Sequence, residues 1–99
     1  MAIKSLSDLQ PYREAIIVLA QEHGARHIRV FGSVARGEAR SDSDIDFLVQ
    51  WDYEQMSAWG GVGLDLALEE LLGCSVDVIS ETGLSPLFKE DVLKEAILL

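Results

Sequence analysis

The most constraining feature of this chain is a pair of aspartates, Asp44 and Asp46, at the start of an apolar run over residues 47–49. If this run is a strand, its side chains alternate across the sheet, so both carboxylates point the same way, ~7 Å apart. The pair follows a turn made by Gly32 and Ser33. Two hard oxygen ligands beside a phosphate-sized turn are what a divalent cation carrying a nucleoside triphosphate requires.

A third carboxylate, Asp77, lies inside the apolar segment at residues 76–79. An ionised carboxylate in an apolar strand is unfavourable unless it is paired or bound to metal. If the two strands are neighbours, Asp77 converges on Asp44 and Asp46, and the three repel one another unless a cation neutralises them. Asp44 and Asp46 could bridge two divalent ions, and Asp77 could bind the one nearer the oxygen that attacks the nucleotide. The alternative is a strand-end carboxylate satisfied by backbone N–H groups or by an arginine.

The turn at Gly32 and Ser33 is the predicted phosphate-binding element. Glycine lets the backbone approach a ligand closely, and a short helix after it points its free N–H groups at an anion. The alternative is an ordinary strand-to-helix turn with Ser33 as N-cap, but its position relative to the aspartates favours phosphate. Arg36 could contact phosphate or brace the loop, and we favour bracing, through a neighbouring carboxylate such as Asp42.

Strands alternate with helices along the chain, which predicts an α/β (α+β) domain with a small mixed β-sheet flanked by helices. Ser5 and Ser7 offer N-caps for a helix that reaches His23, with Gly24 as its stop. Strands are predicted at residues 28–31, 44–50 and 75–79, and further helices around residues 34–36, over residues 64–72 and from Ser85-Pro86, the last with Phe88, Val92 and Ala96 on one apolar face.

Residues 52–63 give no clear element. The glycines within residues 60–63 favour a flexible connection or a lid over the nucleotide, because no clear strand precedes them and no lysine accompanies them as in a phosphate loop. Trp59 is a candidate contact with a partner.

Composition narrows the class of protein. The 99 residues are the size of one domain, predicted to span residues 1–99, and carry a net charge of −9 from 17 acidic residues against 8 lysines and arginines. Binding to long nucleic acids rests mainly on Lys and Arg, so this chain disfavours nucleic acid and suits a metal-chelated nucleotide or a basic protein. No apolar stretch reaches the ~18 residues of a membrane span, and the lone Cys74 fits a reducing cytoplasm.

Three segments of the chain resemble a known family. Residues 31–38, Phe-Gly-Ser-Val-Ala-Arg-Gly-Glu, and residues 41–46, Ser-Asp-Ser-Asp-Ile-Asp, resemble the minimal nucleotidyltransferases (MNT) of the DNA polymerase β-like superfamily. The family pattern is Gly-Ser, ten variable residues and Asp-x-Asp, and residues 34–43 fill the gap without insertion or deletion. Residues 72–79 resemble the later segment that carries the third carboxylate.

The resemblance implies a polymerase β-like palm fold and transfer of a nucleoside monophosphate from Mg²⁺-ATP to a hydroxyl, with release of pyrophosphate. It implies that Asp44 and Asp46 ligate two Mg²⁺ ions and that Asp77 completes the catalytic metal site and can take the proton of the hydroxyl. Gly32 and Ser33 would hold the β- and γ-phosphates.

Minimal members of the family are typically antitoxins encoded with a HEPN toxin, an RNase, which they silence by attaching AMP to a toxin tyrosine. The resemblance therefore implies a cytoplasmic protein adenylyltransferase whose partner is a HEPN-type toxin, and an acidic surface would complement a basic RNA-cutting partner. Two alternatives stay open. One is an antitoxin that neutralises its toxin by binding alone, and the other is a small-molecule adenylyltransferase whose acceptor domain is supplied in trans.

Overall fold

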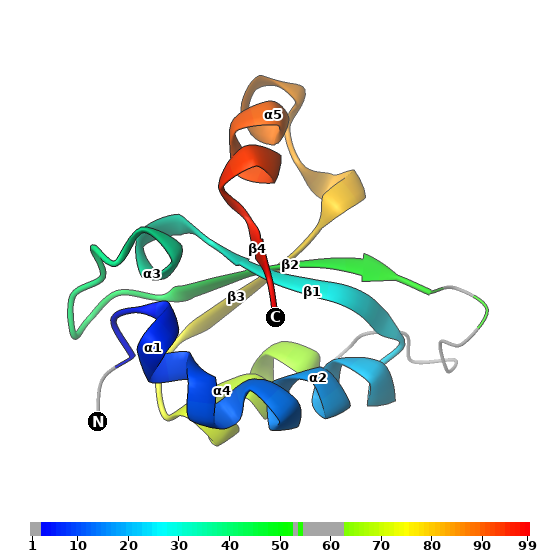
Figure 1. Ribbon diagram of the computed structural model, residues 1–99. Coiled ribbons are helices and arrows are strands. Elements are labelled where there is room, and N and C mark those ends of the chain that lie inside the picture. The colour runs from blue at the N-terminus through cyan, green and yellow to red at the C-terminus, as the bar shows by residue number, and fades with distance from the viewer. Residues whose placement is uncertain (1–2, 53, 55–62) are drawn as a thin grey trace.

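The computed structural model describes residues 3–52, 54 and 63–99. One mixed sheet is formed by four strands, which are β1 (Ala25–Phe31), β2 (Ile45–Trp51), β3 (Val76–Ser80) and β4 (Ile97–Leu98). Their order is β3-β2-β1-β4 (Figure 1). β2 and β3 are parallel, and β1 runs antiparallel to both β2 and β4. The predicted mixed sheet is confirmed. β4 was not predicted, because a strand of two residues is too short to show an alternating pattern in the sequence.

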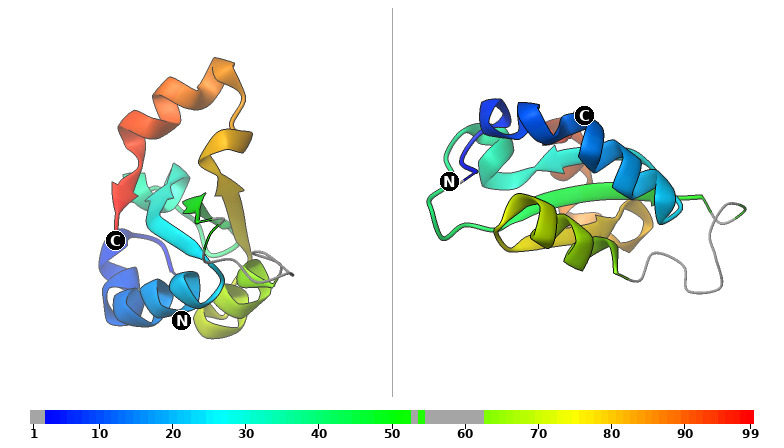
Figure 2. Two further views of the ribbon diagram at one scale, coloured as in Figure 1. Left: turned by 90° about the vertical axis from the view of Figure 1, so that its right-hand side faces the viewer. Right: turned by 90° about the horizontal axis from the view of Figure 1, so that it is seen from below.

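Three helices cover one face of the sheet (Figures 1 and 2). They are α1 (Leu6–Leu9), α2 (Arg13–Glu22) and α4 (Leu64–Leu72). The prediction of one continuous N-terminal helix is wrong, because the chain forms a 3-10 turn, η1 (Gln10–Tyr12), around Pro11, which lacks the N–H that a helix interior needs. Within the described part of the chain, no helix has both the length and the apolar character to cross a membrane.

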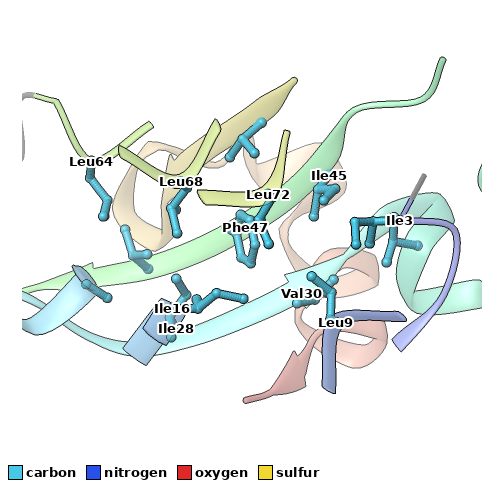
Figure 3. Packing of buried hydrophobic residues seen from close by; sticks show 14 of the residues in the cluster. Ile3, Leu9, Ile16, Ile28, Val30, Ile45, Phe47, Leu64, Leu68 and Leu72 are labelled. Carbon is cyan, nitrogen blue, oxygen red and sulfur yellow. The ribbon is translucent and has the colours of Figure 1, made fainter. Parts of the chain in front are cut away.

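The hydrophobic core lies between these helices and the sheet (Figure 3). Along β2, every second residue points toward the helices, and Ile45, Phe47 and Val49 are fully buried there. We call this side of the sheet the core face. The helices contribute residues at a spacing of three to four positions, among them Ile16 of α2 and Leu64, Leu68 and Leu72 of α4.

The opposite side of the sheet, toward which Asp46, Leu48 and Gln50 of β2 point, is called the site face. Helix α5 (Pro86–Glu95) follows the 3-10 turn η2 (Glu81–Gly83) and lies on this side (Figures 1 and 2). The connections β2-α4-β3 and β3-α5-β4 both join parallel strands, and they cross the sheet in opposite directions. Because such crossovers are right-handed, α4 and α5 must lie on opposite faces.

The start of α5 is as predicted, but its packing is not. Ser85 caps the helix with its hydroxyl, and Pro86 occupies the first position. The predicted apolar face is wrong, because Phe88 is 62% exposed and Ala96 lies beyond the last helical residue. None of the residues of α5 is buried. The helix stands above the site face, away from the core against which its apolar residues were expected to pack.

The segment before α4 is described only in part. The predicted partner contact at Trp59 lies outside the described residues, as does most of the predicted lid. Gly63 forms the N-cap of α4, and Trp51 packs partly buried against the core.

Candidate active site

Asp46 and Asp77 stand side by side on the site face. They are register partners in the parallel pair of β2 and β3. Partners in neighbouring strands lie ~4.8 Å apart and project toward the same side of a sheet. The prediction that these two strands are neighbours is therefore confirmed, and it brings together two acidic residues that are far apart in the sequence.

Asp44 lies two residues before Asp46, immediately ahead of β2, and its side chain is exposed. The N–H of Ile45 donates to the carbonyl of Ser75 at 3.0 Å, which aligns the beginnings of β2 and β3. Asp46 and Asp77 are each the second residue of their strand. All three predicted acidic residues consequently gather where β2 and β3 begin.

Asp44, Asp46 and Asp77, which we call the acidic group, lie in surroundings that make the ionised form of Asp46 unfavourable. Burial and, after it, the negative charges of Asp77 and Asp44 raise the pKa of Asp46 to about 6, while Arg36 opposes the rise. Within the described residues, no hydrogen bond to Asp46 contributes to offsetting this rise. A carboxyl group in such surroundings is stabilised in its charged form by a nearby cation.

Gly32 places the predicted phosphate turn directly against Asp46. Its φ is +76°, a left-handed conformation that side chains rarely adopt. A Cβ atom at this position would overlap the Oδ2 atom of Asp46, so the close approach also requires glycine. Gly32 begins the short helix α3 (Gly32–Arg36), and Ser33 is its second residue. The turn and the acidic group therefore form one site.

Arg36, at the end of α3, braces the loop through two glutamates. Its guanidinium lies 3.1 Å from Glu38 and 2.5 Å from Glu95. A bracing ion pair is thus present, but the predicted partner Asp42 is wrong. Asp42 is exposed in the loop before β2, and Arg36 turns toward α5 instead.

Glu95, the last residue of α5, is a site residue that sequence analysis misses. Its Oε2 atom accepts the N–H of Gly32 at 2.8 Å, and its Oε1 atom accepts from Arg36. Burial raises the pKa of Glu95, but the hydrogen bonds from Arg36 and Gly32 outweigh burial, so the net pKa is lowered. The partners lie 63 and 59 residues away in the sequence, and no local pattern marks Glu95 among the other charges of α5.

The donors at this site suit a hard divalent cation. Carboxylate oxygens are the ligands that Mg²⁺ prefers, and a cation would remove the repulsion that raises the pKa of Asp46. Among the described residues, no three His, Cys, Asp or Glu side chains already surround one point. Asp44 and Asp77 are exposed, so packing does not fix their side chains. The chemistry of these residues fits a divalent cation such as Mg²⁺.

The space around the acidic group is open. A cavity of about 300 Å³ lies farther along the site face, where β2 and β3 end, and the aspartates do not line it. Its lining residues are Gln50, Trp51, Ser80, Glu81, Thr82 and Lys89. Asp77 lines a second hollow of about 220 Å³, together with Trp51 and the start of α4. Of the three acidic residues, only Asp77 lines one of these hollows, and Asp44 and Asp77 are exposed.

Residues 12–99 match the family model described as Nucleotidyltransferase domain. The chain belongs to this family. The resemblance seen in residues 31–38, 41–46 and 72–79 is thereby confirmed, and the protein is a nucleotidyltransferase.

Relatives in archaea match this nucleotidyltransferase over most of their length. A Thermococcus cleftensis protein named protein adenylyltransferase MntA is 41% identical over 80 residues, which are 80% of this chain and 79% of the relative. A Methanocaldococcus jannaschii protein, provisionally named a protein adenylyltransferase, is 38% identical over 90 residues, covering 91% of this chain and 96% of the relative.

Solved structures share the fold of this nucleotidyltransferase. One, provisionally described as a minimal nucleotidyltransferase, has a TM-score of 0.82 and 53% identity, with 96% of each chain covered. A toxin–antitoxin structure with AMP-PNP has a TM-score of 0.70 over 87% of this chain and 70% of its own. Its identity of 23% supports the shared fold alone.

Proposed function

We propose that this nucleotidyltransferase transfers AMP from Mg²⁺-ATP to a tyrosine hydroxyl of a HEPN-type RNase toxin and so acts as its antitoxin. The observation that carries the proposal is the pairing of Asp46 with Asp77 on the site face, against the turn at Gly32. The choice of a protein as acceptor is supported by the relative named protein adenylyltransferase MntA.

The turn would hold the triphosphate. Backbone N–H groups from Gly32 onward and the Ser33 hydroxyl are donors suited to the β- and γ-phosphates, and Arg36 adds a positive charge beside them. Held in this way, the α-phosphorus is left exposed to in-line attack. Asp46, which touches the turn, would hold the metal of the nucleotide together with Asp44.

Asp77 would act on the acceptor. Its side chain is exposed, whereas Asp46 is half-buried, so a hydroxyl brought by another protein can reach Asp77 more readily. Asp77 receives the proton of the tyrosine hydroxyl while the tyrosine oxygen forms a bond to the α-phosphorus. The bond between the α-phosphorus and the bridging oxygen breaks, and pyrophosphate leaves with the electron pair. When bound, Mg²⁺ neutralises charge on the phosphates and favours loss of the hydroxyl proton.

Co-expression with the protein encoded by the adjacent gene tests the proposal, with intact mass spectrometry of that protein as readout. We expect mass gains of whole AMP units on a tyrosine, abolished by Asp44→Ala. Asp42→Ala is a matched control, because Asp42 lies in the same loop outside the acidic group.

The other outcomes identify the alternatives. Toxicity that stays suppressed by Asp44→Ala, with no mass added by the unmodified enzyme, would point to an antitoxin that acts by binding alone. An adjacent gene of unrelated type, together with AMP appearing on small molecules, would point to an adenylyltransferase with its acceptor domain supplied in trans.

A further inference from the structure

The carboxylate of Glu95 engages two donors at the phosphate turn. It accepts the N–H of Gly32 at 2.8 Å with one oxygen and is 2.5 Å from the guanidinium of Arg36 with the other. A carboxylate held by a backbone N–H at a turn and by an arginine has the contacts that a phosphate oxygen would make there. The helix that carries it crosses the site face from the end of β3 to β4.

We propose that Glu95 is an internal stand-in for a phosphate group, so that α5 closes the turn of the nucleotide-free protein and opens when a triphosphate displaces it. This inference rests on the proposed function, because it takes the turn at Gly32 as the triphosphate site. Glu95 is then a positioning residue. It touches neither the metal nor the acceptor, and it sets how much of the enzyme is ready to bind nucleotide.

The packing of α5 allows such an opening. None of its residues is buried, and its first turn is largely exposed, with Leu87 at 84% and Phe88 at 62%. The ion pair between Lys94 and Glu90 lies within the helix, at side-chain exposures of 72% and 80%, and so holds the helix to nothing else. The Glu95 side chain is only 26% exposed. Its two contacts therefore supply the polar attachment of the end of α5 to the turn.

Displacement by a nucleotide also has a driving force. Glu95 brings a negative charge to Gly32, which itself lies against the carboxylate of Asp46. A triphosphate brings its own divalent cation, whereas Glu95 brings none, so the exchange replaces repulsion with attraction. Apparent nucleotide affinity is then reduced by the fraction of molecules that are closed.

The competing account makes Glu95 a fixed brace that shapes the turn for phosphate. In that account, the bond between Gly32 and Glu95 persists when nucleotide binds, and loss of the Glu95 charge weakens binding because the turn loses its support. The two accounts predict opposite changes in affinity and in the exposure of α5, so one pair of measurements separates them.

The test uses the full chain, Mg²⁺ and a non-hydrolysable ATP analogue, with calorimetric Kd values and hydrogen exchange of the α5 amides. Glu95→Gln keeps the shape of the side chain and removes its charge. Glu90→Gln is the matched control, because it removes the same charge from the same helix, and Glu90 pairs with Lys94 and not with the turn.

We expect Glu95→Gln to bind the analogue about fivefold more tightly and Glu90→Gln to stay within about twofold of the unmodified protein. Nucleotide should speed exchange of the last α5 amides in the unmodified protein, and Glu95→Gln should show fast exchange without nucleotide. Weaker binding by Glu95→Gln, equal gains in both variants, or slower α5 exchange with nucleotide would overturn the closed-turn inference alone. Failure of every form to bind the analogue would overturn the proposed function and this inference with it.

Discussion

The two faces of the sheet are built from the same strands under opposite constraints. On the core face, alternate residues of β2 are 0% exposed and pack against three helices. On the site face, the intervening Asp46 has a pKa raised to about 6, and no residue of the helix above it is itself buried, although Leu48 of β2 is 1% exposed on this face. Burial of apolar surface makes the core face the source of stability, whereas the site face keeps like charges close together, ready for a ligand that neutralises them.

The largest expected effect is on the chemistry of the site face. Asp46→Asn keeps the size of the side chain and removes its charge, so the fold should remain and AMP transfer should fall by about 10³-fold, as expected when a metal ligand is lost. Rates of pyrophosphate release in the presence of the acceptor measure this. Asp42→Asn, outside the acidic group, should stay within about twofold, and retention of a tenth of the activity by Asp46→Asn would break the assignment.

A pair of phenylalanines compares the stability of the two faces. Phe47 is 0% exposed on the core face, so Phe47→Ala should lower the free energy of unfolding by about 3–5 kcal/mol. Phe88 on α5 is 62% exposed, and Phe88→Ala should change it by less than about 0.5 kcal/mol. Urea unfolding followed by circular dichroism provides both values. Equal losses would mean that α5 is part of the core.

A pair of glycines tests the contact between turn and carboxylate. Gly32 and Gly37 both have positive φ, so alanine at either position should cost about 1 kcal/mol of stability. Only at Gly32 would the new Cβ meet Asp46, since nothing lies within 4 Å of a Cβ at Gly37. We expect Gly32→Ala to lose a further tenfold or so in affinity for the metal–nucleotide complex, measured by calorimetry. The same loss from Gly37→Ala would show that strain alone explains it.

The smallest expected effect is on stability as a function of pH. The folded pKa of Asp46 is about 6 against 3.8 for the unfolded group, so folding favours the protonated form. Its contribution to stability is complete below pH 3.8 and is lost as pH rises through about 6. As the pH rises between these values, the stability of Asp46→Asn should therefore increase relative to that of the unmodified, metal-free protein. The expected increase in the free energy of unfolding is about 1 kcal/mol, or ~4 °C in Tm, after allowance for solvent screening. A constant Tm difference would contradict the raised pKa.

Sequence analysis predicts those features of the site face that a local sequence pattern marks. The spacing from Gly32 to Asp46 and the acidic residue inside the third apolar segment lead to the turn and to neighbouring strands. The attachment of Glu95 cannot be predicted in this way, because it depends on where α5 lands after crossing the sheet. The same cause explains the wrong partner for Arg36, since a nearby aspartate is visible in the sequence and a glutamate 59 residues away is not.

The core face is predicted more fully, because periodicity of two on strands and of three to four on helices reports burial directly. One error, the helix broken at Pro11, comes from the missing N–H of that residue, and another is the start of β1, which lies at Ala25 and not at residue 28. The apolar residues of α5 mislead for a different reason. Phe88 and Val92 have helical spacing, but the handedness of the crossover carries them to the face opposite the main hydrophobic core.

The most direct test of the central claim is the position of a bound metal on the sheet. NMR spectra of the full chain with a non-hydrolysable ATP analogue and substoichiometric Mn²⁺ report this through paramagnetic broadening. We expect the amide signals of Gly32, Asp46 and Asp77 to broaden first, those of the core face such as Leu68 to stay sharp, and Asp46→Asn to abolish the effect. Broadening that is strongest away from these three residues, or unchanged in Asp46→Asn, would contradict a metal–nucleotide site on this face.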